Sequence, residues 1–346
     1  MPAMTKKRGG IKKAARLLIL TLYLGLLLTA FSCGTEPPAK FKNSLGMEFV
    51  LIPAGNFQMG SSREDLKQMM ADFKKATGRE YRRKWLMHVR DEMPRHQVEI
   101  TNPFYMQTHE VSNDQFAAFV KATGYRTTAE ERGGGWSYAP SGWHPLPGAD
   151  WRHPLGPASS IQGKGNHPVV QVSWLDAMAF CRWLSQKESK TYSIPSEAQW
   201  EYACRGGLSK TLYSWGTEMP PQRLVANMPD LAYARQVGKE RHHVQGYDDG
   251  HADTAPVGAY EANGFGLYDM IGNVWEWCLD WYEANYYAVS PEKDPAGPPK
   301  GTHRVLRGGS FCYLPSNLRC ADRFRNLPRF RCHFAGFRLV MATPAP

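Results

Sequence analysis

The sequence predicts one large domain in which short helices and strands alternate with long irregular segments. Four serine-capped stretches have helical periodicity, and short stretches of alternating apolar residues are typical of strands. By contrast, residues 133–169 and 206–346 are rich in Gly, Pro, Trp and Asn and have little periodicity. The chain has 346 residues and eleven Trp, enough aromatic surface for much of one core.

The first 32 residues have the composition of an export signal. Six basic residues and no acid precede an apolar run at residues 17–31. This run is shorter than the roughly 20 residues that span a bilayer as a helix. Ser32 and Cys33 follow this run directly, as in a lipoprotein signal. We therefore expect residues 1–32 to be a lipoprotein signal peptide, Cys33 to carry lipid, and residues 33–42 to be a tether. An uncleaved N-terminal anchor is the alternative.

Removal of this leader changes the charge and cysteine arguments. The chain has a formal net charge of +10, and six of these charges lie in the leader, which leaves +4. Nucleic-acid binding thereby loses its main support. The expected location is a membrane-anchored lipoprotein on the periplasmic or extracellular face, where disulfides form. The six cysteines of the mature chain are Cys181, Cys204, Cys278, Cys312, Cys320 and Cys332.

Helix signals occur at four places. Ser62 and Asp65 form a capping pair before apolar residues at helical spacing, which predicts a helical insert at residues 62–91 with its apolar stripe facing the core. Serine caps predict further helices at residues 112–123, at residues 173–187 and from Ser196.

Strand signals lie before and after the predicted insert. Residues 47–60 alternate apolar and polar positions around Pro53 to Gly55, which predicts a hairpin that turns at this Pro/Gly cluster. Residues 96–100 predict a further strand.

Several long strings carry a family resemblance. They are WRHPLGP (151–157), HPVVQVSWLDAMAFCRW (167–183), IPSEAQWEYACRGG (194–207), TAPVGAYEANGFGLYDMIGNVWEWCLDWY (254–282), RVLRGGSF (304–311) and GFRLV (336–340). In this order they resemble the formylglycine-generating enzyme, or sulfatase-modifying factor, family across residues 43–340, with residues 341–346 as a tail. The resemblance implies one α+β domain of the formylglycine-generating-enzyme fold, with little regular secondary structure and a C-type-lectin-like element.

The resemblance also implies bound calcium. Ca²⁺ takes six to eight oxygen ligands, which irregular backbone supplies as carbonyls beside carboxylates. One implied site takes the side chains of Asn227 and Asp249 with the carbonyls of Met228 and His251. The other takes the side chains of Asp269 and Glu276 with the carbonyls of Gly272 and Val274. The alternative, that these carboxylates only accept hydrogen bonds from loop amides, is stronger for the first site.

Family members that make formylglycine oxidise a cysteine within a Cys-x-Pro-x-Arg-type segment of a sulfatase, using oxygen and a Cu(I) bound by two thiolates. The family places these thiolates three and eight positions after the serine of its GGS motif. Here those positions hold Tyr313 and Leu318, neither of which binds Cu(I), so copper is doubtful. Ser310 and Trp275 match positions that line the family's active cleft, and Cys312 is the remaining candidate for redox chemistry. Core packing for Trp275 and a tight turn at Ser310 are the structural alternatives.

For the cysteines, the resemblance implies a structural disulfide between Cys204 and Cys320. Cys312 with Cys320 is also a candidate for a shifted metal pair. The pairings that remain open are Cys181 with Cys332 and Cys278 with Cys312. Spacing alone leaves the connectivity undecided.

Three functions fit these observations. The first is an oxidoreductase that modifies a cysteine of a sulfatase or of another exported protein or peptide. The second is a non-catalytic relative that binds peptides or partner proteins at the cell envelope. The third is copper-independent oxidation of another substrate, such as a siderophore precursor. Likeness of fold does not choose among them, because function depends on the site.

Overall fold

The structure is a computed structural model that describes Met1 and residues 39–343, with gaps at 83–85, 87–88, 140–141 and 239–241. The predicted signal peptide, Cys33 and most of the tether therefore lie outside the described residues. Within the described ranges, no helix combines the length and apolar character needed to cross a membrane.

The four predicted serine caps are confirmed, and each forms a capping box with the residue three positions later. The helices that follow these caps are α1 (Arg63–Thr77), α2 (Asn113–Thr123), α4 (Trp174–Glu188) and α5 (Glu197–Arg205). Helix α1 ends where Gly78 adopts a φ of 68°, so it is shorter than the predicted insert at 62–91. Its Met69 and Phe73 are buried, which confirms the predicted core-facing stripe.

The hairpin predicted at residues 47–60 is wrong. Strand β2 (Glu48–Ile52) pairs with β1 (Lys40–Lys42) and β5 (Phe104–Gln107), whereas β3 (Gly55–Met59) pairs with β4 (His96–Ile100). The two residues between β2 and β3 therefore carry the chain from one sheet into another. The hairpin prediction failed because a local turn signal does not specify which strand will be the partner. The predicted strand at residues 96–100 is confirmed as β4.

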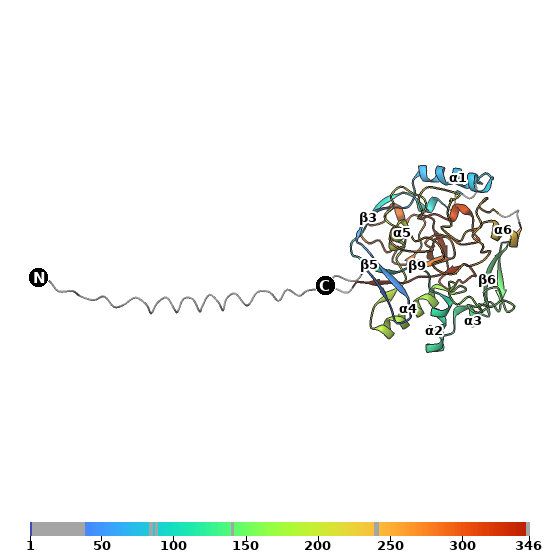
Figure 1. Cartoon of the computed structure of the whole chain (residues 1–346), viewed down its shortest axis with the longest axis horizontal. Coiled ribbons are helices and arrows are strands. Elements are labelled where there is room, and N and C mark those ends of the chain that lie inside the picture. The colour runs from blue at the N-terminus through green and yellow to red at the C-terminus, as the bar shows by residue number, and fades with distance from the viewer. Residues whose placement is uncertain (2–38, 83–85, 87–88, 140–141, 239–241, 344–346) are drawn as a thin grey trace. The chain divides into compact units, whose positions relative to one another are not determined.

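Two larger sheets bring distant segments together (Figure 1). The five-stranded sheet has the order β1-β2-β5-β13-β8, where β13 is Val340–Ala342 and β8 is Tyr192–Ser193. The four-stranded sheet has the order β11-β10-β9-β12, formed by Phe324–Asn326, Arg304–Arg307, Trp275–Trp281 and Ala335–Gly336. Strands β6 (Gly134–Ala139) and β7 (Gly142–Pro147) form a separate hairpin. The remaining elements are α3 (Thr128–Arg132), α6 (Leu231–Val237) and the 3₁₀ turns η2 (Arg90–Glu92), η3 (Tyr286–Ala288) and η4 (Pro315–Asn317).

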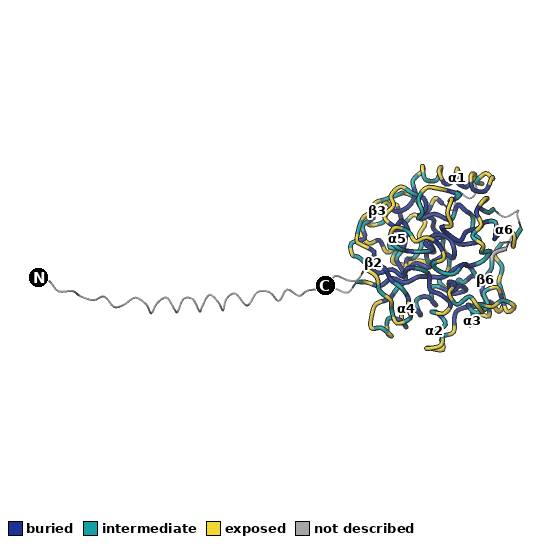
Figure 2. The backbone as a smooth tube through the Cα atoms, in the orientation of Figure 1, coloured by how far each residue is buried: buried dark blue, intermediate teal, exposed yellow. Residues whose placement is uncertain are grey.

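Buried residues lie in the centre of the domain (Figure 2), and the buried apolar residues form two clusters. The first core cluster includes Trp200, Cys204, Cys278, Leu318 and Cys320. The second core cluster includes Phe180, Cys181, Trp275, Cys332 and Phe337. Strand β9 contributes to both, through Cys278 to the first and Trp275 to the second. The expected α+β class with short elements is confirmed.

Candidate functional site

The loop that precedes β9 has an unusual backbone. Asp269, Gly272 and Asn273 all have positive φ, of 56°, 87° and 52°. A Cβ added to Gly272 would lie 2.2 Å from the carbonyl oxygen of Asn227, so only glycine fits this approach. The amide of Asn273 donates to that same carbonyl at 2.8 Å, and the amide of Gly272 donates to Gly308 at 2.8 Å. The loop is thus held between the Asn227 segment and the GGS motif.

Two buried carboxylates meet beside this loop. Burial raises the pKa of Asp269 to about 6 and that of Glu110 well above its usual range, and the charge of Asp269 raises the pKa of Glu110 further. One oxygen of Asp269 accepts from the amide of Gly258 at 2.6 Å, and one of Glu110 accepts from Asn273 Nδ2 at 3.0 Å. The other two, Asp269 Oδ1 and Glu110 Oε2, have no hydrogen-bond donor among the described residues. A cation would satisfy both oxygens.

Glu276, which the resemblance implies as a calcium ligand beside Asp269, has other partners. Arg338 donates to both of its carboxylate oxygens at 2.7 Å, and Trp200 Nε1 donates to one of them at 2.9 Å. Glu110 therefore offers the unpaired oxygen that Glu276 does not. Nothing in the sequence indicated Glu110, because it lies in a different segment and belongs to no spacing motif.

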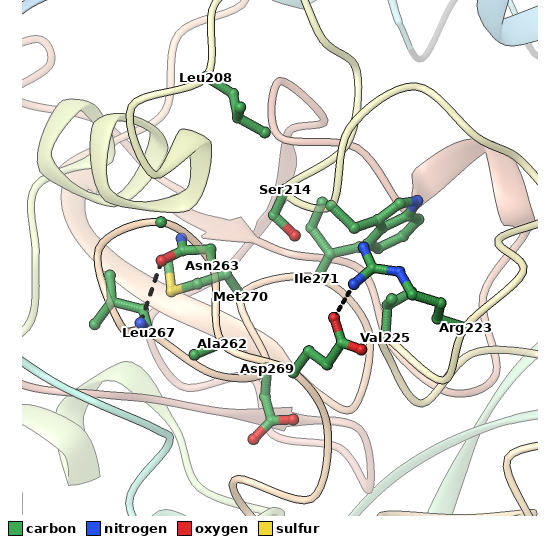
Figure 3. Close-up of a pocket in the computed structure, with 13 residues that line it drawn as sticks. Leu208, Ser214, Arg223, Val225, Ala262, Asn263, Leu267, Asp269, Met270 and Ile271 are labelled. Carbon is green, nitrogen blue, oxygen red and sulfur yellow. Dashed lines mark hydrogen bonds and ion pairs between the residues drawn. The ribbon is translucent and has the colours of Figure 1, made fainter.

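The carboxylate and carbonyl oxygens at this loop are the type of ligand that a hard cation takes. Across the described ranges, no group of three His, Cys, Asp or Glu side chains is placed to hold a metal ion. Calcium would consequently depend on Asp269 and Glu110 together with amide and carbonyl oxygens, such as the implied carbonyls of Gly272 and Val274. Asp269 also borders a cavity of about 180 Å³ that carries an Arg223–Glu261 ion pair. Its carboxylate points away from Arg223, so that arginine does not neutralise it (Figure 3).

The other implied calcium site shows the hydrogen-bonding alternative in part. The carboxylate of Asp249 accepts from the amide of Met228 at 3.1 Å and from the amide of His251 at 2.7 Å. Asn227 Oδ1 is buried and has no partner in the part of the chain that is described. Burial raises the pKa of Asp249 to about 7, and the nearby Asp230 raises it further. The unpaired amide oxygen and the buried negative charge both fit a cation.

Of the candidate catalytic residues, Ser310 and Cys312 are neighbours, and Trp275 contacts Tyr313, the residue after Cys312. Ser310 Oγ is 3.6 Å from Cys312 Sγ. The ring of Trp275 is buried against Tyr313 and Phe324, with centroids 5.4 and 5.2 Å apart. Of the six cysteines that the structure describes, Cys312 alone is partly exposed. The catalytic role of these three residues stays a prediction.

A cavity of about 100 Å³ lies next to this group, lined on one side by Phe311 and His333. Burial lowers the pKa of His333 to about 4, so this imidazole is neutral at physiological pH. Lys164 and Asp253 form an ion pair of 2.7 Å at the cavity, and Leu155 and other apolar side chains complete its walls. Apolar walls with a few polar groups are typical of binding sites.

Comparison with known proteins agrees with this architecture. The family described as "Sulfatase-modifying factor enzyme 1-like domain" matches residues 35–343. The chain belongs to the formylglycine-generating enzyme family. The formylglycine-generating enzyme of Streptomyces coelicolor is 42% identical over 267 residues, which cover 71% of this chain and 80% of that protein. The enzyme of Thermomonospora curvata is 39% identical over 326 residues, which cover 87% of this chain and 95% of that protein.

Two further relatives cover most of the chain. A mouse protein named "Inactive C-alpha-formylglycine-generating enzyme 2" is 31% identical over 345 residues, 93% of each chain. The structure of PvdO from Pseudomonas aeruginosa has a TM-score of 0.65 and 26% identity, and the match covers 89% of this chain and 100% of that one.

The two positions that hold the copper thiolates of formylglycine-generating enzymes carry no thiol here. Leu318 is fully buried in the first core cluster. Tyr313 packs against the second, where its ring contacts those of Trp275, Phe324 and Phe334 at 5.2 to 5.6 Å. Neither side chain carries a thiolate, and both are taken up in apolar packing, so these positions do not fit Cu(I).

The structure separates the predicted cysteine pairings. The sulfur atoms of Cys204 and Cys320 are buried and lie 3.3 Å apart, which places the pair implied by the family side by side. Cys278 lies in the first core cluster, whereas Cys312 packs against the second. This arrangement does not bring Cys278 to Cys312. Cys181 and Cys332 lie in the same cluster, and their pairing stays a prediction.

Proposed function

We propose that this protein is an exported member of the formylglycine-generating enzyme family that binds a segment of another envelope protein and does not form formylglycine through a copper thiolate pair. One observation carries the proposal. Tyr313 and Leu318 occupy the two thiolate positions and are packed into separate core clusters. The mouse relative that is named inactive supports the idea that this scaffold persists without that chemistry.

The surroundings of the cavity support peptide binding. On the β6–β7 hairpin, Trp143 is 38% exposed, and its ring packs against Phe330 and Phe334 at 5.1 and 5.5 Å. Phe334 follows His333, which lines the cavity. Partly exposed aromatic residues beside a small cavity are typical of protein-binding surfaces, where one partner side chain enters a pocket and its neighbours cover the rim.

Export and calcium belong to the same proposal. The leader with Cys33 supports a lipid-anchored protein on the periplasmic or extracellular face, where other exported proteins are its partners. Calcium held by Asp269 and Glu110 would neutralise two buried carboxylates and fix the positive-φ loop before β9. Trp275 is the first residue of β9 after that loop, so the ion would hold the candidate site in place.

One observation favours oxidation as a second candidate function. Cys312 is partly exposed, lies 3.6 Å from Ser310, and stands next to the cavity wall at Phe311. A thiol in this position is accessible to a cysteine-bearing peptide. On this alternative, the protein is an oxidoreductase whose activity depends on Cys312.

One experiment separates the two candidates. The mature chain without lipid is incubated with Cu(I), oxygen and a Cys-x-Pro-x-Arg peptide, and peptide mass and fluorescence anisotropy are recorded. We expect saturable peptide binding, no stoichiometric Cu(I) and no aldehyde. If aldehyde forms, is lost in Cys312→Ser and persists in Cys278→Ser, the binding proposal is wrong and the protein is an oxidoreductase that depends on Cys312. Absence of saturable binding to this peptide, and to the matched Ser-x-Pro-x-Arg peptide, would overturn the peptide-binding proposal.

A further inference from the structure

Two chain segments run side by side along the wall of the cavity. The rings of Phe311 and His333 lie 5.9 Å apart, and those of Tyr313 and Phe334 lie 5.2 Å apart. Cys312 lies between Phe311 and Tyr313 in the first segment, and Cys332 directly precedes His333 in the second. The flanking ring contacts therefore bring the two cysteines into the same neighbourhood.

Cys332 lies in the second core cluster, and Cys312 packs against it. Cys332 is fully buried there, and Cys312 packs against the cluster from a partly exposed position. Burial raises the pKa of Cys332 well above its usual range, and the nearby Cys312 thiol raises it further. The effect of Cys312 on the pKa of Cys332 agrees with the closeness that the ring contacts indicate.

We propose that Cys312 and Cys332 form a disulfide that joins the two segments lining the cavity. Hydrogen bonds already fix the backbone on both sides. The carbonyl of Cys332 accepts from the amide of Gln171 at 2.9 Å, and the amide of Phe311 donates to Asn273 at 3.0 Å. The bond would add a covalent link between segments that these contacts hold in register.

The other cysteines leave this pair available. Cys204 and Cys320 lie beside each other at 3.3 Å, which accounts for both. Cys278 lies on β9 in the first core cluster. Cys181, on α4, shares the second core cluster and is the competitor for Cys332.

The chemistry requires a disulfide oxidant, for which oxidised glutathione is the probe. The exposed Cys312 thiolate attacks one glutathione sulfur and releases glutathione, which leaves a mixed disulfide on Cys312. The Cys332 sulfur then attacks Cys312 Sγ, loses its proton and releases the second glutathione. In total, two protein thiols give up two protons and two electrons, and one glutathione disulfide becomes two glutathione thiols. Because burial disfavours the Cys332 thiolate, the second step is the slower one.

The bond has a consequence for the candidate site. Phe311 and His333 both line the cavity of about 100 Å³, one from each joined segment. Oxidation would fix the distance between these two walls, whereas reduction would leave it to ring packing alone. The inference stands without the peptide-binding proposal, because it concerns only thiols of this chain.

Peptide mapping tests the pairing directly. The mature chain is oxidised with glutathione disulfide, denatured, alkylated and digested with trypsin, which cleaves after Arg319 and separates Cys312 from Cys320. We expect a linked pair of peptides, 308–319 with 332–338, that dithiothreitol splits. A Cys181–Cys332 link, or alkylation of both Cys312 and Cys332, would overturn the proposal.

Two variants sharpen the result. Cys312→Ser should leave Cys332 open to alkylation after denaturation, and its partly exposed position makes it the variant that tolerates substitution. Cys278→Ser is the matched control, because its thiol lies in the other cluster, and it should retain the 308–319 to 332–338 link. Because the unmodified chain already decides the pairing, a variant that fails to fold does not remove the test.

Discussion

The packing of Tyr313 and Leu318 predicts that restoring cysteines at the family's copper positions fails to restore a copper site. The perturbation is the double variant Tyr313→Cys/Leu318→Cys. Leu318 is fully buried, and truncation of a buried leucine to a smaller side chain costs about 2 kcal/mol or more. Tyr313 loses three aromatic contacts, each of about 0.5 to 1.5 kcal/mol, or about 2 kcal/mol together.

The two losses should add, because the side chains pack in different core clusters. We therefore expect the double variant to lose about 4 kcal/mol of unfolding free energy, a large part of the roughly 5 to 15 kcal/mol of a typical domain. Urea unfolding of the two single variants and the double variant measures the loss and the coupling, which should stay below about 0.5 kcal/mol. Leu327→Cys, at a residue that is 52% exposed, is the control and should cost little.

Measurement of Cu(I) binding shows directly whether cysteines at residues 313 and 318 form a copper site. Competition with a chromophoric Cu(I) chelator should show no tight site in the double variant beyond what the wild-type chain binds. A gain of one tightly bound Cu(I) per chain, together with strong coupling between the two substitutions, would show that residues 313 and 318 converge. The separation of the two core clusters would then be the wrong explanation for the missing site.

Three further predictions concern stability. Chelation with EDTA should lower the thermal midpoint, because an ion bound only by the folded state stabilises it, and Asp269→Asn should weaken the effect; an unchanged midpoint would count against both calcium sites. Burial raises the pKa of Asp280 to about 7, above the roughly 3.9 of an unfolded aspartate, so its contribution to stability is present at low pH and is lost as the pH rises toward 7. The unfolding free energy of Asp280→Asn, measured with urea, should therefore rise relative to that of wild type by about 2 to 3 kcal/mol as the pH goes from 5 to 8. The exposed control Asp248→Asn should show no such gain, and a difference independent of pH would contradict the assignment. Finally, Cys204 and Cys320 are 116 positions apart, and a disulfide over such a loop contributes about 4 to 5 kcal/mol in the chain-entropy account. Dithiothreitol should lower the unfolding free energy of the oxidised protein by at least this amount, and Cys204→Ser should remove this part of the sensitivity; equal sensitivity in the variant would exclude the pair.

Features encoded within a few residues were predictable from the sequence. The helix starts at Ser62 and Ser173 could be located because a serine and an acid three positions later satisfy each other's backbone donors. The absence of copper thiolates followed from counting positions after Ser310. Strand partners were not predictable in this way. The break between β2 and β3 was located correctly at Pro53, but the partner of β3 is β4, almost forty residues along the chain.

The site depended still more on tertiary structure. The family resemblance implied Asp269 and Glu276 as ligands of one ion, yet Glu276 is paired with Arg338, and the other carboxylate beside Asp269 is Glu110. No local pattern marks Glu110, since its importance comes from burial next to a loop distant in sequence. The neighbourhood of Cys312 and Cys332 was likewise missed, because it depends on ring contacts between two segments that carry no common motif.

These observations explain how the fold keeps its cleft without the family's copper pair. Glu276 on β9 is bound by Arg338, and Glu201 on α5 is bound by Arg307 on β10, with all four side chains buried. Removal of one partner from a buried ion pair costs about 3 to 5 kcal/mol, so these pairs hold the sheet and helix around the site regardless of what lies after Ser310. The thiolate positions contribute only to local packing, and Tyr313 and Leu318 supply that packing with apolar side chains. The scaffold can therefore lack the metal ligands and still present the cavity and the aromatic side chains beside it.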